Sequence, residues 1–187
     1  MHGYDAKNLG QAFRTVRKNT IQIADEIPED KYDFHPADGS RSVAETLRHI
    51  SVSTNWPIHA HGQGLTELNF GLFMEVHAQQ AKDEAELKTK SDIVKALHKN
   101  GEEFATFMEG LSDEILAEKV SFPPQSNQAP KTRFEMLLSS KEHEMHHRAQ
   151  LMLVERMLGM VPHLTRAMQE RMAATQQQQP AGARSAQ

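Results

Sequence analysis

The feature that most constrains the fold is a long segment without helix-breaking residues near the carboxyl end of the chain. Residues 133–158 contain neither proline nor glycine, the two residues that most strongly interrupt helices. Thr132 and Glu135 form a capping box before this segment, and Gly159 and Pro162 follow it. These signals predict a helix of about seven turns, which needs other helices to cover its apolar side.

Two more helices are expected in the first third of the chain, from apolar residues at helical spacing. The first covers residues 5–27 and is stopped by Pro28. The second opens with the capping box of Ser42 and Glu45, and Pro57 is expected to bend or end it. Glu45 is interpreted as a capping residue, with a ligand-orienting or proton-relaying role as the alternative.

The middle of the chain is expected to hold one further main helix between two connections. Residues 62–90 form a partly helical crossover, and residues 112–131, which contain three prolines, form a loop. The helix between them starts at Ser91 and Asp92, and Gly101 is a weak point within it. No alternation typical of strands persists, so the predicted fold is an all-α four-helix bundle with long crossover connections.

At 187 residues the chain has the size of one domain. The bundle is predicted to take up residues 1–160, and residues 161–187 add a short C-terminal helix and a polar tail. A net charge of −4 without a dense basic run argues against nucleic acid as a partner. No stretch is apolar enough for a membrane span and the start lacks a signal-peptide pattern, so a cytoplasmic protein without a membrane partner is expected.

The candidate chemistry lies in a pair of histidines on the long helix. His143 and His147 are four residues apart, a spacing that lets one metal ion bind both rings. A helical wheel puts five residues that suit a buried stripe on the same face: Met136, Ser140, Gln150, Val154 and Leu158. Two buried neutral imidazole rings beside each other satisfy each other's hydrogen-bonding nitrogens poorly. A shared metal or separate polar partners are the two alternatives.

His49 is the candidate for a third ligand. It lies within the second helix, away from the polar face of that helix, and catalytic metal sites typically use three protein ligands and leave one position open. The chain has no cysteine, so it offers neither a thiolate ligand nor a thiol nucleophile. An ordinary half-buried histidine bonded to a carbonyl or to water is the alternative for each of the three.

The remaining histidines are assigned other roles. His146, next to the pair, is expected to support the site from outside the triad or to pack against it. Four histidines lie near loops or on segments of uncertain structure and are expected at the surface: His59, His61, His77 and His98.

Three segments of the sequence resemble the DinB-like superfamily of bacterial four-helix-bundle proteins. They are IPEDKYDFHPADGSRSV at residues 27–43, ETLRHI at residues 45–50 and HEMHHRAQ at residues 143–150. The resemblance covers roughly residues 5–160 and implies a divalent metal bound by His49, His143 and His147. Ala149 stands where the family commonly has glycine, so a methyl group is expected to narrow the helix packing beside the site.

The resemblance also implies a metal-dependent enzyme. Family members include transferases and isomerases that act with low-molecular-weight bacterial thiols. The expected function is therefore a transferase or hydrolase whose metal activates water or such a thiol toward a small-molecule substrate. The metal is left open, because three imidazoles suit Zn, Ni, Fe and Cu alike. The alternative is a metal-binding or stress-response protein without turnover, its site closed by a fourth protein ligand.

One segment of the long helix suggests an oligomer. Residues 151–158 are apolar nearly all round, and several methionines follow them. A helix of this kind is commonly covered by another chain or helix. A homodimer that uses this segment is therefore expected.

Overall fold

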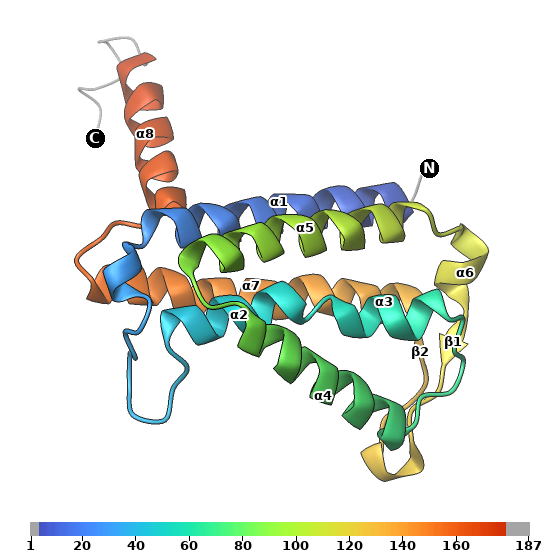
Figure 1. The fold of residues 1–187 in the computed structure, drawn as a ribbon. Coiled ribbons are helices and arrows are strands. Elements are labelled where there is room, and N and C mark those ends of the chain that lie inside the picture. Colours follow the sequence, from blue (N-terminus) through green and yellow to red (C-terminus); the bar gives the residue numbers. More distant parts are fainter. Residues whose placement is uncertain (1–3, 179–187) are drawn as a thin grey trace.

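Four helical units form the body of the computed structural model, which describes residues 4–178 (Figure 1). They are α1 (Ala6–Glu26), α2 (Val43–Val52) with its continuation α3 (Asn55–Gly62), α5 (Lys90–Glu109) and α7 (Arg133–Met157). Helix α1 packs against α5 and α7, and α2 packs against the same two helices. The predicted all-α four-helix bundle is confirmed.

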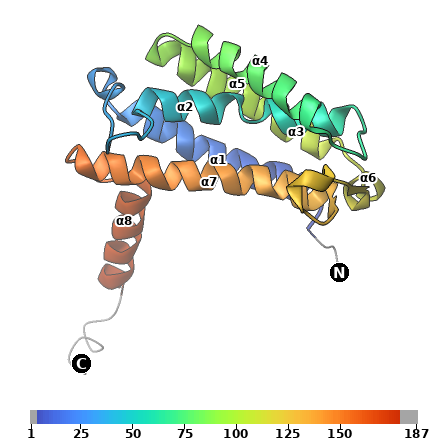
Figure 2. The same ribbon diagram turned by 90° about the horizontal axis from the view of Figure 1, so that it is seen from below.

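Shorter elements connect or extend the bundle. They are η1 (Glu29–Lys31), α4 (Phe70–Glu86), α6 (Asp113–Ala117), β1 (Lys119–Val120), η2 (Pro124–Ser126), β2 (Lys131–Thr132) and α8 (His163–Gln178). The crossover helix α4 packs on α2 and α3 outside the bundle (Figure 2). Helix α8 projects away from the bundle in both views. The rest of the expected polar tail, residues 179–187, lies outside the described residues.

Two predictions for the middle of the chain are wrong. Helix α5 begins after Thr89, not at Ser91, because Thr89 and Asp92 exchange the two reciprocal bonds of a capping box. Residues 112–131 are more than a loop, since they include α6 and a short antiparallel hairpin in which Val120 lies opposite Lys131. Strands of two residues are too short to show an alternating pattern.

Pro57 does not end the second helix. The chain turns at residues 53–54, ahead of the proline, and α3 then starts as a separate helix. Pro57 sits in the first turn of α3, where its missing N–H has no helical acceptor to lose. Within the described residues, no helix is both long and apolar enough to cross a membrane.

The hydrophobic core falls into two main clusters on either side of a buried ion pair. One cluster includes Ile21, Leu47, Ile50, Ile93, Leu97 and Leu151. The other includes Leu9, Phe13, Phe104, Met108 and Leu137. Between them lie Arg17 of α1 and Glu144 of α7, both almost completely buried.

Arg17 joins all four helical units through this ion pair. Its Nε donates to both carboxylate oxygens of Glu144 at 2.9 and 3.0 Å. Its two terminal nitrogens donate to the carbonyl oxygens of Leu97 on α5, at 2.8 Å, and Ile50 on α2, at 3.2 Å. We call these two side chains and their bonds the Arg17 layer.

Gly101 is part of the same arrangement. A Cβ atom at this position would lie 2.6 Å from Cγ of Arg17, closer than real side-chain carbons approach. The predicted weak point in α5 stays a prediction, and the helix runs through Gly101 without a break. The absent side chain makes room for Arg17.

Candidate metal centre

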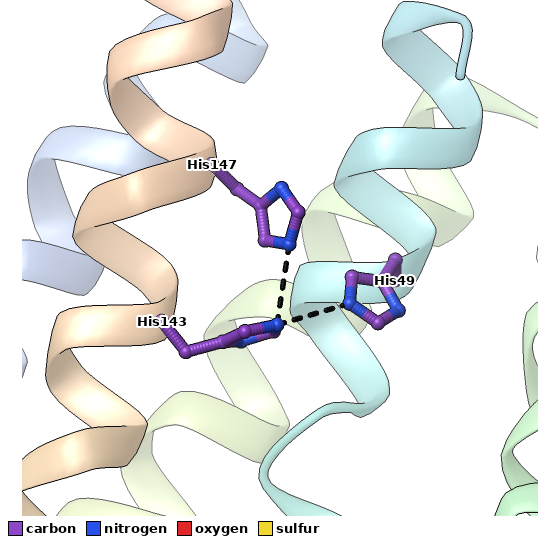
Figure 3. Close-up of side chains that lie close together, drawn as sticks. All are labelled: His49, His143 and His147. Carbon is purple, nitrogen blue, oxygen red and sulfur yellow. Dashed lines mark hydrogen bonds between the residues drawn. The ribbon is translucent and has the colours of Figure 1, made fainter. Parts of the chain in front are cut away.

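The three histidines predicted from the sequence come together between α2 and α7 (Figure 3). Nε2 of His143 lies 3.2 Å from Nε2 of His49 and 3.2 Å from Nε2 of His147. One ring nitrogen from each residue lies within 4.8 Å of the other two. Among the residues that the structure describes, no further His, Cys, Asp or Glu joins this group. We call it the histidine triad.

Neighbouring side chains determine which ring nitrogen of the triad carries hydrogen. Nδ1 of His147 is 2.8 Å from Oε1 of Gln150, and a carbonyl oxygen only accepts, so Nδ1 donates. A carboxylate oxygen of Glu84 on α4 lies 3.4 Å from Nδ1 of His49. Hydrogens on these outer nitrogens leave the Nε2 atoms of His49 and His147 with lone pairs that point toward His143.

Burial keeps the rings of the triad neutral. It lowers the pKa of His49 to about 3 and that of His143 to about 4, and it lowers the pKa of His147 as well. The positive charge of Arg41 acts in the same direction on all three. Neutral imidazole is the form that binds metal ions.

The nitrogen spacing fits a divalent metal. Two imidazole nitrogens bound to one tetrahedral zinc at about 2.0–2.1 Å lie about 3.3–3.4 Å from each other. The two 3.2 Å separations in the triad are close to this value. A hydrogen on Nε2 of His143 can bond to either lone pair, and a cation bound by all three rings would take the place of that hydrogen.

One side of the triad borders a cavity of about 340 Å³, with His49 and His143 in its wall. A volume of this size is typical of small-molecule sites. The arrangement therefore combines three protein ligands with space for a further molecule beside them.

The predicted stripe of α7 is confirmed only in part, since Val154 is buried and three of its other members are partly buried: Met136, Ser140 and Leu158. Gln150 and Ala149 are exposed, whereas Leu137, Glu144 and Leu151 are buried. The predicted stripe lies toward the side of α7 that borders the cavity, where Met136 and Ser140 line the wall. Because Ala149 is exposed, its methyl group does not narrow the packing beside the triad.

His146 is exposed and contacts the triad from outside. Its ring meets that of His147 edge to face at 5.1 Å, and its Nε2 accepts from the side-chain amide of Gln150 at 3.2 Å. Glu45 caps α2 as predicted, since its side chain accepts from the backbone N–H of Ser42 at 2.7 Å.

The expectation of a surface position is wrong for His61. It is buried, and its Nδ1 lies 3.1 Å from a terminal nitrogen of Arg133. Burial first, and then the charge of Arg133, lower its pKa to about 4. The sequence reasoning failed here because α3, as a separate helix, packs against α7 on the side that carries His61. His77 and His98 are exposed and His59 is partly exposed.

Three charged residues near the triad were missed from the sequence. Arg17 is four residues from both Phe13 and Ile21, so a basic residue on an apolar stripe was the available signal. Glu144 likewise stands seven residues from two buried leucines of α7. Glu84 lies in a charged run and carried no such signal.

Comparisons with known proteins agree with this fold. The sequence profile of the DinB superfamily matches residues 12–151. The uncharacterized protein YjoA of Bacillus subtilis is 26% identical over 147 residues, which cover 79% of this chain and 86% of YjoA. The crystal structure of YjoA is similar with a TM-score of 0.60 at 22% identity, over 81% of this chain and 91% of that chain.

Two other solved structures have the same fold. YfiT of Bacillus subtilis, described as a probable metal-dependent hydrolase with an unusual four-helix bundle topology, is similar with a TM-score of 0.67 at 16% identity, over 86% of this chain and 91% of that chain. An uncharacterized protein of Clostridium difficile 630 is similar with a TM-score of 0.63 at 15% identity, over 83% of this chain and 98% of that chain.

Proposed function

Because the chain belongs to the DinB superfamily, we propose that it is a metal-dependent enzyme whose one divalent ion is held by His49, His143 and His147. The observation that carries this proposal is a set of three neutral imidazoles with a cavity beside it and no fourth ligand among the described residues. A purely structural site is usually closed by four protein ligands. The fold shared with YfiT supports the same reading.

The residues of this chain have defined parts in such a site. Gln150 and Glu84 orient His147 and His49 through their Nδ1 atoms. A divalent metal, when bound, supplies a Lewis acid that lowers the pKa of a bound water or thiol. Apolar side chains in the cavity wall keep bulk water from the substrate.

We further propose that the second reactant is a low-molecular-weight thiol, which would make the protein a transferase. The chain itself has no cysteine, so a reacting sulfur must come from another molecule. Cobalt(II)-loaded protein should then develop a sulfur-to-metal charge-transfer band when candidate bacterial thiols are added. If no thiol perturbs the spectrum while a test ester is hydrolysed, the enzyme is a hydrolase and the thiol part is refuted.

Metal analysis tests the ligand assignment directly. Wild-type protein purified without a tag should bind one divalent ion per chain, and His143→Ala should bind none. His98→Ala, which removes an exposed imidazole from α5, is the control and should keep the full content. An unchanged metal content in His143→Ala would refute the assignment.

We also propose that the protein is a homodimer. Four large apolar side chains on α7 and α8 are more than half exposed: Leu153, Met157, Met168 and Met172. The projection of α8 leaves this surface uncovered by its own bundle (Figure 1), and exposed apolar patches commonly mark interfaces. Light scattering at low micromolar concentration should show twice the chain mass, and a particle of 21.1 kDa would contradict the proposal.

A further inference from the structure

The cavity beside the triad has walls from four separate parts of the chain. Trp56 from α3, Phe73 from α4, Phe122 from the hairpin segment and Met136 from α7 all line it. Its chemistry is therefore decided by tertiary contacts and not by one motif. This chemistry indicates which molecules the cavity can bind.

Aromatic rings form much of the wall. The rings of Trp56 and Phe73 meet edge to face, with centroids 5.5 Å apart, and Phe73 meets His77 in the same way at 4.7 Å. Phe73 is nevertheless 40% exposed. Ring faces held in place by edge contacts and still open to solvent favour a flat apolar ligand.

One positive charge, on the exposed Lys131, completes the wall. Lys131 on β2 lines the cavity, and its ammonium group lies 5.9 Å from the centroid of the Phe122 ring. Within the described residues, no Asp or Glu lines the cavity. The nearby carboxylate of Glu135 interacts with Lys131 but is bonded to the Thr132 cap outside the lining. An aromatic wall with one cation and no anion suits a negatively charged aromatic molecule.

We propose that the cavity binds a small aromatic carboxylate, with its ring against Trp56 and Phe73 and its carboxylate on Lys131. This inference rests on the proposed function in one respect, since such a molecule would be the substrate placed beside the triad. Binding itself does not require the metal. The two proposals can therefore be tested apart.

The single tryptophan of the chain reports on this cavity directly. In the nitrogen-15 spectrum of full-length, chelator-treated protein, the one indole N–H signal should shift saturably with benzoate. Benzamide, which keeps the ring without the charge, and acetate, which keeps the charge without the ring, should each bind about tenfold more weakly, which corresponds to about 1.4 kcal/mol.

Two variants separate the contributions of charge and ring. Lys131→Met should weaken benzoate about tenfold and leave benzamide unchanged, because only the ion pair is lost. Phe73→Leu should weaken both compounds about fivefold. Lys119→Met is the control, since Lys119 is an exposed lysine of the same hairpin that does not line the cavity, and it should bind both compounds like wild type.

The alternative outcomes are distinct. Equal affinity for benzoate and benzamide, or no effect of Lys131→Met, would refute the role of Lys131. Benzoate binding that appears only after metal loading and ignores Lys131→Met would show that the carboxylate binds the metal, which refutes this inference and leaves the metal site standing. Benzoate binding by protein that takes up no metal would support the inference and refute the proposed function.

Discussion

The Arg17 layer and the histidine triad are neighbours in one bundle, yet their polar groups have different kinds of hydrogen-bond partner. Within the described residues, no buried nitrogen or oxygen of Arg17 or Glu144 lacks a partner. In the triad, by contrast, the described residues offer the three Nε2 atoms only one another as partners, and the one hydrogen that Nε2 of His143 can carry is shared by the lone pairs of His49 and His147, each 3.2 Å away. A network in which every donor has its own acceptor holds the fold together, whereas three nitrogens that share one hydrogen can exchange it for a metal ion.

The two regions are also joined through the backbone. Glu144 directly follows His143, and the Ile50 carbonyl that accepts from Arg17 belongs to the residue after His49. The Arg17 layer therefore sets the distance between the two helices that carry the triad. Its hydrogen bonds hold the three imidazoles in position.

The largest expected effect comes from breaking the Arg17 layer. Arg17→Met and Glu144→Gln should each lower the free energy of unfolding by about 3–5 kcal/mol, because each leaves a buried partner uncompensated. The double variant Arg17→Met with Glu144→Gln should lose less than the sum of the two single losses. Urea unfolding measures all three.

Glu142→Gln, an exposed change on the same helix, is the control and should have no measurable effect. Losses below about 1 kcal/mol in the single variants would mean that the layer behaves like an ordinary surface pair. The contrast between the two regions would then be wrong.

The triad should contribute to stability only when a metal is present. At a free metal concentration one hundred times the Kd, binding should stabilise the wild type by about 2.7 kcal/mol. His143→Ala should show no such gain, and its metal-free stability should stay close to that of the metal-free wild type. Thermal unfolding with and without metal gives both values. An equal gain in the variant would place the bound ion elsewhere.

Gly101→Ala tests the space that Arg17 occupies. Alanine usually stabilises a helix over glycine by up to about 1 kcal/mol, but here the new carbon would lie 2.6 Å from Cγ of Arg17. We expect a loss of about 2 kcal/mol from overpacking. At Gly62 of α3 the same carbon would meet only the Phe107 ring at 3.7 Å. Gly62→Ala should therefore cost nothing, and a stabilising Gly101→Ala would contradict the packing argument.

Glu155 provides the smallest and most pH-dependent test. It is fully buried, and within the described residues neither of its carboxylate oxygens has a hydrogen-bond partner. Burial, then the negative charge of Glu26, raise its pKa to about 7, against the opposing effect of Arg166 and Arg156.

The sign of the pH dependence follows from this shift. An unfolded chain releases the Glu155 proton near pH 4.5, while the folded protein keeps it to about pH 7. The stability from this residue is therefore complete below pH 4.5 and is lost as the pH rises through 7. Glu155→Gln should be more stable than wild type by about 1 kcal/mol at pH 8 and equal to it at pH 4.5. A difference that does not change with pH, measured by urea unfolding, would contradict the assignment.

Much of the fold was readable from local sequence signals. The capping boxes at Ser42 and Thr132 begin α2 and α7 as predicted, because these bonds join residues only three apart. The absence of proline and glycine allowed α7 its full length. The spacing of His143 and His147 placed two rings on one side of a helix for the same local reason. The position of His49 away from the polar face of α2 made it the candidate third ligand, and the family resemblance implied the same three residues.

The contacts between helices were decided only by the tertiary structure. The buried side of α7 is centred on Leu137, Glu144 and Leu151 because α1 and α2 pack there. A helical wheel of α7 does not show which helices pack on it. His61 is buried because α3 packs against α7. Glu84 lies close to His49 because α4 packs on α2. Helix caps and apolar periodicity depend on residues that are close in sequence, so they can be predicted from the sequence. Which face of a helix is covered, and by which charge, depends on segments far apart in the sequence, such as those of Arg17 and Glu144, which are 127 residues apart.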